Sequence, residues 1–429
     1  MKRKTNIGIL RIVIVGLLLF STGAVLAQSP APGAGGKRGA REPKPPKDGG
    51  RGYSIEQAVS DKAQLHTIAF NGLAFMTGTL GADTFLPPGK VADFFGFQYM
   101  RDIDISEAGH NMNFLTNIAN NMLAILSAEQ KALLVGLARE QEPLYKELAL
   151  LRLPLIEAFR RNLEGNAPAG SGGLSAEAVE RHVGDIFAID GLLSFRRAEV
   201  YGEVVGSLTP EQTAAISRLL FNDSSTWPPL PQQLDKRSLS HTQNVAVMTY
   251  ASELFSWYAG SIEADVYFCP ERHGTYFGGF YMKDYPAMGN PDYFIPTALT
   301  GESGETFLDI LESDQRALIT GIIDLQRPAL AEIVAIRRQV AEELRRFLDG
   351  RMVEKETVLE LSRRYGELDG ELSHLYASRF AAVYKTLSSG QKAALVELRN
   401  QNVFPEGAYI YSDSVAMPEI PDSGFLFAR

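Results

Sequence analysis

Two short aromatic blocks contain the residues best suited to bind another molecule. They read Phe94-Phe-Gly-Phe-Gln-Tyr99 and Tyr276-Phe-Gly-Gly-Phe-Tyr281, and glycine among so many rings favours an irregular loop. Such loops either form a sticky surface for apolar segments of a client or partner, or plug the core and the seam between two parts of the fold. The candidate binding residues are the rings of both blocks: Phe94, Phe95, Phe97, Tyr99, Tyr276, Phe277, Phe280 and Tyr281.

A single thiol offers a second kind of chemistry. Cys269 is the only cysteine and precedes His273 by four residues, so the two could act as nucleophile and base or as two zinc ligands. A buried, inert thiol is the alternative. The six histidines show no ligand spacing such as H-E-x-x-H. The weak metal candidates are His66, His110, His273 and Cys269.

Other catalytic motifs are missing from the sequence. It contains no nucleophile elbow, no phosphate-binding loop and no dinucleotide fingerprint. We therefore assign no catalytic residue and expect no cofactor, and nothing in the sequence favours an enzyme.

The first 52 residues are typical of an exported chain. Basic residues precede a short apolar stretch that ends at Val25-Leu26-Ala27, which predicts a signal peptide over residues 1–27. Residues 28–52 are rich in proline, glycine and basic residues, and predict a disordered tether. We expect a periplasmic or secreted protein with no stable membrane span in its mature form. The net charge of −9 argues against nucleic acid as a partner.

An internal duplication is the strongest pattern in the chain. Residues 82–102 align without a gap on 264–284, with 8 of 21 positions identical. Residues 126–165 align on 311–350, with 14 of 40 identical. The predicted organisation is copy 1 over 53–221, a proline-rich linker over 222–238, copy 2 over 239–412 and a C-terminal tail over 413–429.

Helical periodicity dominates both copies. In 126–165 leucines recur at steps of three and four residues, which predicts an amphipathic helix that is kinked or restarted near Pro143. Short Leu-Ser/Thr-x-x-Gln boxes predict helix starts, because Ser or Thr caps the third following N–H while Gln reaches back. Glu312 is a poorer cap in one of them. The boxes contain Leu126, Ser127 and Gln130; Leu208, Thr209 and Gln212; Leu311 and Gln315; and Leu387, Ser388 and Gln391. The fold class predicted is all-α.

These boxes resemble the LTxxQ motif of the periplasmic chaperone and stress-sensor family that includes Spy and CpxP. Leu208-Thr-Pro-Glu-Gln212 is the most similar, and each copy carries two boxes at matching places. In that family, two small helical protomers pair into a curved cradle that holds partly unfolded clients. The resemblance implies a pseudo-dimer on one chain, with the aromatic blocks as additional loops.

Three hypotheses for function follow. The first is an exported, non-enzymatic protein that binds unfolded or envelope protein clients, as the resemblance implies. The second is a periplasmic metal sensor or metal-binding protein, since related family members sense metal. The third is an envelope structural or assembly component, for which self-association through the aromatic blocks is expected.

Overall fold

The computed structural model describes residues 61–77, 113–220, 224–260, 262, 301, 304–400 and 420–429. These residues form helices joined by turns, and they contain no strand beyond one isolated bridge, so the all-α prediction is confirmed. The α-helices are α2 (Asp61–Thr77), α4 (Asn113–Ile125), α5 (Ala128–Glu164), α6 (Ala176–Gly206), α7 (Pro210–Ile216), α8 (His241–Ala259), α10 (Glu305–Asp309), α11 (Ser313–Thr320), α12 (Ile322–Arg345), α13 (Lys355–Thr386) and α14 (Ser389–Asn400). Short 3-10 turns are η3 (Ser224–Thr226), η4 (Lys236–Ser238), η7 (Arg346–Asp349) and η8 (Gly424–Leu426).

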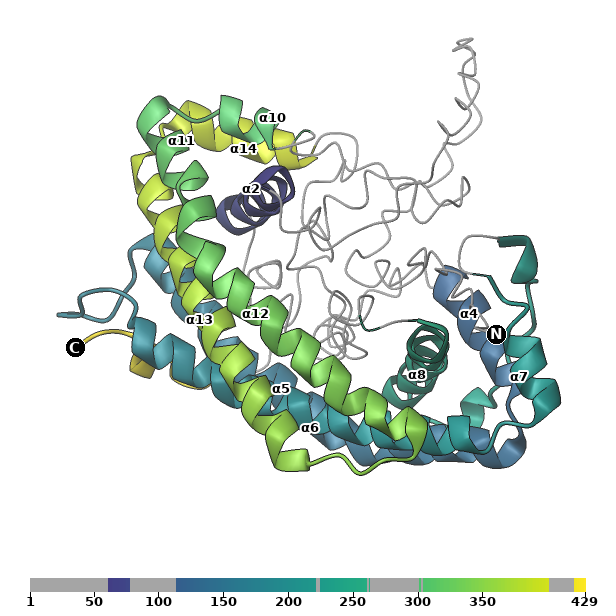
Figure 1. Ribbon diagram of the computed structural model, residues 1–429. Coiled ribbons are helices and arrows are strands. Elements are labelled where there is room, and N and C mark those ends of the chain that lie inside the picture. Colours follow the sequence, from purple (N-terminus) through teal and green to yellow (C-terminus); the bar gives the residue numbers. More distant parts are fainter. Residues whose placement is uncertain are drawn as a thin grey trace, which may run out of the picture.

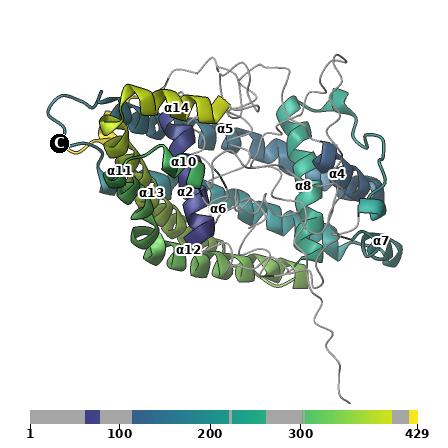
Figure 2. The same cartoon turned by 90° about the horizontal axis from the view of Figure 1, so that it is seen from above.

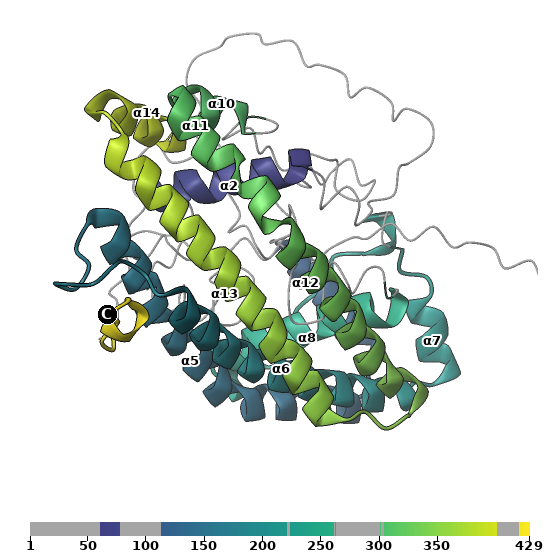
Figure 3. The same cartoon turned by 60° about the vertical axis from the view of Figure 1, so that its left-hand side comes forward.

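The described helices form a V (Figure 1). Helices α5 and α6 run along one arm and α12 and α13 along the other. Figure 3 shows α12 and α13 side by side, and Figure 2 shows from above how α2 and α8 lie far apart, one on each arm. The most extensive contact in the molecule is between α6 and α13, which joins the two arms.

Close packing at the junction of the arms depends on glycine. A Cβ atom on Gly191 of α6 would lie 2.5 Å from the Ser362 Oγ of α13. One on Gly370 of α13 would lie 2.7 Å from the Glu180 Cα of α6. Gly191 and Gly370 are equivalent in the two copies. The glycine of each duplicated Asp-Gly pair therefore allows the two antiparallel helices to approach closely.

The long amphipathic helix differs from its prediction. Helix α5 runs unbroken from Ala128 to Glu164 through both Pro143 and Pro154, so the predicted restart near Pro143 is wrong. Pro143 is exposed and Pro154 is buried, so the helix continues through one proline at the surface and one in the core. In copy 2 the helix does divide, but at Gly321 between α11 and α12 rather than at Pro328.

The first described helix of each copy packs in the other copy's arm. Helix α2 belongs to copy 1 by sequence but contacts α10, α11, α12, α13 and α14. Helix α8 begins copy 2 but contacts α4, α5 and α6. The ring of Phe75 in α2 lies 6.1 Å from Phe380, and the ring of Trp257 in α8 lies 5.9 Å from Tyr201. The two helices are thus exchanged between the copies.

The predicted linker and tail are both packed where they are described. Trp227 of the linker is buried and stacks edge-on against Phe255 of α8, with ring centroids 4.6 Å apart. The Asn121 side chain of α4 donates to the Pro228 carbonyl over 2.9 Å. At the end of the chain, residues 420–429 pack against α5 and α6, with Leu426 fully buried.

Candidate functional site

Two of the predicted boxes meet at the end of the copy 1 arm. Ser127 and Thr209 each cap their helix, and Gln130 and Gln212 each accept from the backbone N–H of their cap residue. The two glutamines also bind each other. Gln212 Nε2 donates to Gln130 Oε1 over 2.8 Å and to the Ile125 carbonyl over 2.9 Å.

The same glutamine pair recurs in copy 2. Gln391 Nε2 donates to Gln315 Oε1 over 2.7 Å and to the Ile310 carbonyl over 3.0 Å. Gln315 accepts from the Glu312 N–H over 2.9 Å, so half of the box survives the poorer cap residue. Ser388 completes its own box with Gln391.

The boxes therefore hold helix ends together. Their glutamine amides bond to one another and to main-chain carbonyls, while Leu126, Leu311 and Leu387 are buried. The capping prediction is confirmed at Ser127 and Thr209. Side chains engaged in this way brace the fold, although Ser127 and Gln130 also line a small pocket of about 300 Å³.

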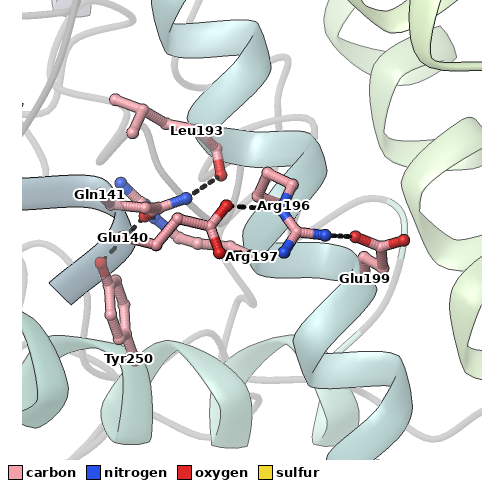
Figure 4. Close-up of polar contacts among 7 residues, drawn as sticks. All are labelled: Glu140, Gln141, Leu193, Arg196, Arg197, Glu199 and Tyr250. Carbon is pink, nitrogen blue, oxygen red and sulfur yellow. Dashed lines mark hydrogen bonds and ion pairs between the residues drawn. The ribbon is translucent and has the colours of Figure 1, made fainter. Parts of the chain in front are cut away.

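A buried ion pair links α6 to the exchanged helix α8. The guanidinium of Arg197 and the carboxylate of Glu253 are fully buried and 3.4 Å apart. The Tyr201 hydroxyl donates to the same carboxylate oxygen over 2.8 Å. Figure 4 shows the adjoining contacts, in which Tyr250 donates to Gln141 Oε1 and Gln141 Nε2 donates to the Leu193 carbonyl. Charges buried this deeply require such partners.

Copy 2 builds the equivalent place without the arginine–glutamate pair. Tyr376 occupies the position of Arg197, and Asn71 of α2 occupies that of Glu253. The Tyr376 hydroxyl donates to Gln326 Oε1 over 2.6 Å, and Gln326 Nε2 donates to Gln64 of α2 over 3.1 Å. Burial and the nearby charge of Asp369 raise the pKa of Tyr376, which keeps the phenol protonated. Both charges are exchanged for neutral groups together.

Four further charged side chains are fully buried, which the periodicity had not revealed. They are two pairs of equivalent residues, Arg152 with Arg337 and Asp190 with Asp369. Arg152 stands between Leu148 and Leu155 on the apolar stripe of its helix, and Arg337 repeats this position in copy 2. An arginine retained on an apolar stripe in both copies was the available signal.

A groove between α5, α6 and the tail is a candidate binding site among the described residues. It has a volume of about 500 Å³. Residues spaced along one face of α5 form its floor, where Pro143 and Pro154 lack the N–H of an ordinary helix residue. Pro154 has glutamine as its counterpart in copy 2, so this floor belongs to copy 1 alone. The lining residues are Pro143, Glu147, Leu150, Leu151, Pro154, His182, Pro421 and Phe425.

His182 supplies the polar edge of the groove. Its Nε2 lies 2.7 Å from the Leu151 carbonyl, and its ring packs edge-on against Phe425 at 5.3 Å. Burial lowers the pKa of His182, although the Leu151 carbonyl and Asp185 act in the opposite direction. The neutral imidazole is therefore favoured, and the groove presents proline, leucine and aromatic surface suited to an apolar ligand.

Most of the sequence-predicted site residues lie outside the described residues. This holds for both aromatic blocks, Phe94 to Tyr99 and Tyr276 to Tyr281, and for His110, Cys269 and His273. His66 falls within α2, but its side chain is not among those described. Within the described part of the chain, no three His, Cys, Asp or Glu side chains gather to hold a metal ion. The aromatic and metal hypotheses stay predictions.

None of the described helices combines the length and apolarity needed to cross a bilayer. Comparison of the chain with protein-family models, curated proteins and solved structures finds no match.

Proposed function

We propose that this protein is an exported, non-enzymatic binding protein that holds apolar segments of unfolded or envelope proteins. It would act like the LTxxQ proteins that its boxes resemble, with two diverged copies forming a pseudo-dimer. Its working surfaces would be the groove and the two aromatic blocks.

The observation that carries the proposal is the duplicated glutamine pair. Gln130 with Gln212, where α5 meets α7, and Gln315 with Gln391, where α11 meets α14, make the same reciprocal amide contact. The resemblance rested on four separate boxes in the sequence. The glutamine contacts join these boxes in two pairs, one in each copy. Two equal arms that meet at α6 and α13 support a pseudo-dimer of the kind that the resemblance implies.

The groove supports binding of apolar chain segments in particular. Its floor of proline and leucine offers little hydrogen bonding, which suits ligands recognised by shape and apolar contact rather than by sequence. Glu147 stands among the lining residues as their one carboxylate. This composition favours a protein-segment ligand over a polar metabolite.

Aggregation of a reduced, unfolding client followed by light scattering tests the function. The mature protein at stoichiometric amounts is expected to suppress the scattering. If the aromatic blocks bind the client, a variant with Phe94, Phe95, Tyr276 and Phe277 changed to serine is expected to lose suppression. If the groove binds the client, the variant Leu150→Ser with Leu151→Ser is expected to lose suppression instead.

The matched control changes exposed leucines away from both places. Leu220 and Leu325 are 46% and 48% exposed, and neither lines the groove. Leu220→Ser with Leu325→Ser should leave suppression intact. No suppression by the folded parent protein would refute the proposed function.

A further inference from the structure

Residues 420–429, here called the tail segment, are held by backbone hydrogen bonds to the loop between α5 and α6 and by the buried side chains of Leu426 and Phe427. Ser175 N–H donates to the Leu426 carbonyl over 2.8 Å, and Ala428 N–H donates to the Gly173 carbonyl over 2.8 Å. Gly172 N–H donates to the Ala428 carbonyl over 3.2 Å. Leu174 and Phe427 thereby form an antiparallel bridge. This is the hydrogen-bonding pattern by which an extended peptide adds to a free edge.

The loop that receives the tail segment is shaped for this contact. Gly173 has a φ of 105°, a conformation that other residues rarely adopt, and it directs its carbonyl to Ala428. Gly165 ends α5 in the left-handed conformation and starts the loop. The loop between α5 and α6 thus supplies the backbone groups that pair with the tail segment.

Few side chains add specificity to the backbone contacts. Leu426 is fully buried and Phe427 is 5% exposed, whereas Phe425, in the middle of the turn η8, is 52% exposed. The Arg161 guanidinium lies over the Phe427 ring at 5.2 Å and donates to the Ser423 Oγ over 3.0 Å. An occupant thus needs a tight turn that becomes extended at its end, with two adjacent apolar side chains there, the second of them aromatic to stack on Arg161.

We propose that the loop between α5 and α6 is a peptide-binding site, and that the tail segment occupies it as an internal ligand. The occupant that replaces it is a segment of another protein with adjacent apolar side chains. Pro421 and Phe425 of the tail segment also line the groove, so displacement uncovers both surfaces together. This inference deepens the proposed function, on which its choice of partner rests.

Competition within the chain makes the site adjustable. The tail segment is covalently attached, so its effective concentration is high and a free peptide must compete with it. Recognition through backbone hydrogen bonds tolerates many sequences, as a protein that meets varied unfolded segments requires. Only segments with suitable adjacent apolar residues bind the loop with enough affinity to displace the tail segment.

The test uses the full chain with Leu426→Asp, which weakens the internal ligand and leaves the loop unchanged. The probe is a fluorescein-labelled peptide with the sequence of residues 420–429, and its binding is followed by anisotropy. The variant should bind the probe at least about ten-fold more tightly than the unaltered chain does, because the internal competitor is weakened. A probe carrying the same Leu426→Asp change should bind the variant at least about ten-fold more weakly.

Two results would overturn the site. One is a variant with unaltered circular dichroism that binds no probe, and the other is equal binding of both probes.

Hydrogen exchange of the unaltered chain is an independent check. The Ala428 and Ser175 amides should exchange at least about 100-fold faster than buried amides of α6 and α13. Exchange as slow as in those helices would show that the tail segment is a fixed part of the core and would refute the proposal.

The experiment separates this inference from the proposed function. Probe binding without suppression of client aggregation would uphold the peptide site and reject the chaperone-like role. Suppression without probe binding would uphold the role and place client binding elsewhere.

Discussion

Arg197 and Glu253 illustrate how single residues join the copies, because each comes from a different copy and both are fully buried. Arg197→Tyr leaves the Glu253 carboxylate without its cation and should lower the free energy of unfolding by about 3–5 kcal/mol. Adding Glu253→Asn, which recreates the Tyr376 and Asn71 combination of copy 2, should restore at least ~1.5 kcal/mol. Urea unfolding of the single and double variants measures this coupling.

An exposed pair between α6 and α5 is the control, because Arg196 is the neighbour of Arg197 on α6. Arg196 and Glu140 are 2.8 Å apart but 35% and 49% exposed, so their coupling should stay below about 1 kcal/mol. Equal coupling for the buried and exposed pairs would contradict the importance that we assign to the buried one.

His182 predicts a pH dependence of stability. Burial lowers its pKa in the folded state below the unfolded value, so protonation favours unfolding. The free energy of unfolding should therefore fall as pH drops from about 6.5 through the lowered folded-state pKa. His182→Gln, which can still donate to the Leu151 carbonyl, should flatten part of this fall. His374, whose pKa burial also lowers, contributes in the same direction. Identical urea-unfolding profiles between pH 8 and pH 5 for both proteins would contradict this.

At the scale of elements, some glycines are needed for close contact between two helices, whereas others only lower the stability of the helix that contains them. Gly370→Ala should destabilise the protein by roughly 1–3 kcal/mol, since its Cβ would lie 2.7 Å from the Glu180 Cα of α6. Gly136 of α5 has nothing within 4 Å of an added Cβ, so Gly136→Ala should stabilise by roughly 0.5–1 kcal/mol. Thermal unfolding of both variants measures the difference, and a shift of the same sign in each would refute the argument.

The sequence was informative about elements and their ends. The helix starts at Ser127 and Thr209 follow from the capping boxes, because a cap and its partner lie within four residues of each other. The continuity of α5 through Pro143 does not follow, because a proline removes a helical hydrogen bond and the local sequence therefore predicts a break there. Local interactions are visible in sequence, whereas the packing of a whole helix against distant residues is not.

At the scale of the whole molecule, exchange of α2 and α8 makes each arm dependent on the other copy. A chain divided between Gln232 and Gln233 should give two fragments that are unstable alone and form a 1:1 complex together. If α2 entered the place of α8 within its own fragment, Arg197 would face Asn71 instead of Glu253. Light scattering after size-exclusion chromatography measures the masses, and stable monomeric fragments would contradict the dependence.

The candidate groove could not be predicted either, because segments far apart in the sequence form it. Its lining comes from α5, from His182 in α6 and from Pro421 and Phe425, which lie more than 230 residues farther along the chain. The missing counterpart of Pro154 in copy 2 was the one hint in sequence. No periodicity indicates that the tail segment packs there.

The sequence by itself determined the all-α class, the duplication and the capped helix starts, because each depends on residues close together or on similarity between the copies. Only the tertiary structure decided that the first helices are exchanged, that Arg152 and Arg337 are buried, and that the boxes pair through their glutamines. Helix periodicity states which side chains share a face, but not which partner covers that face. The partner is selected by long-range packing and by the pairing of buried charges.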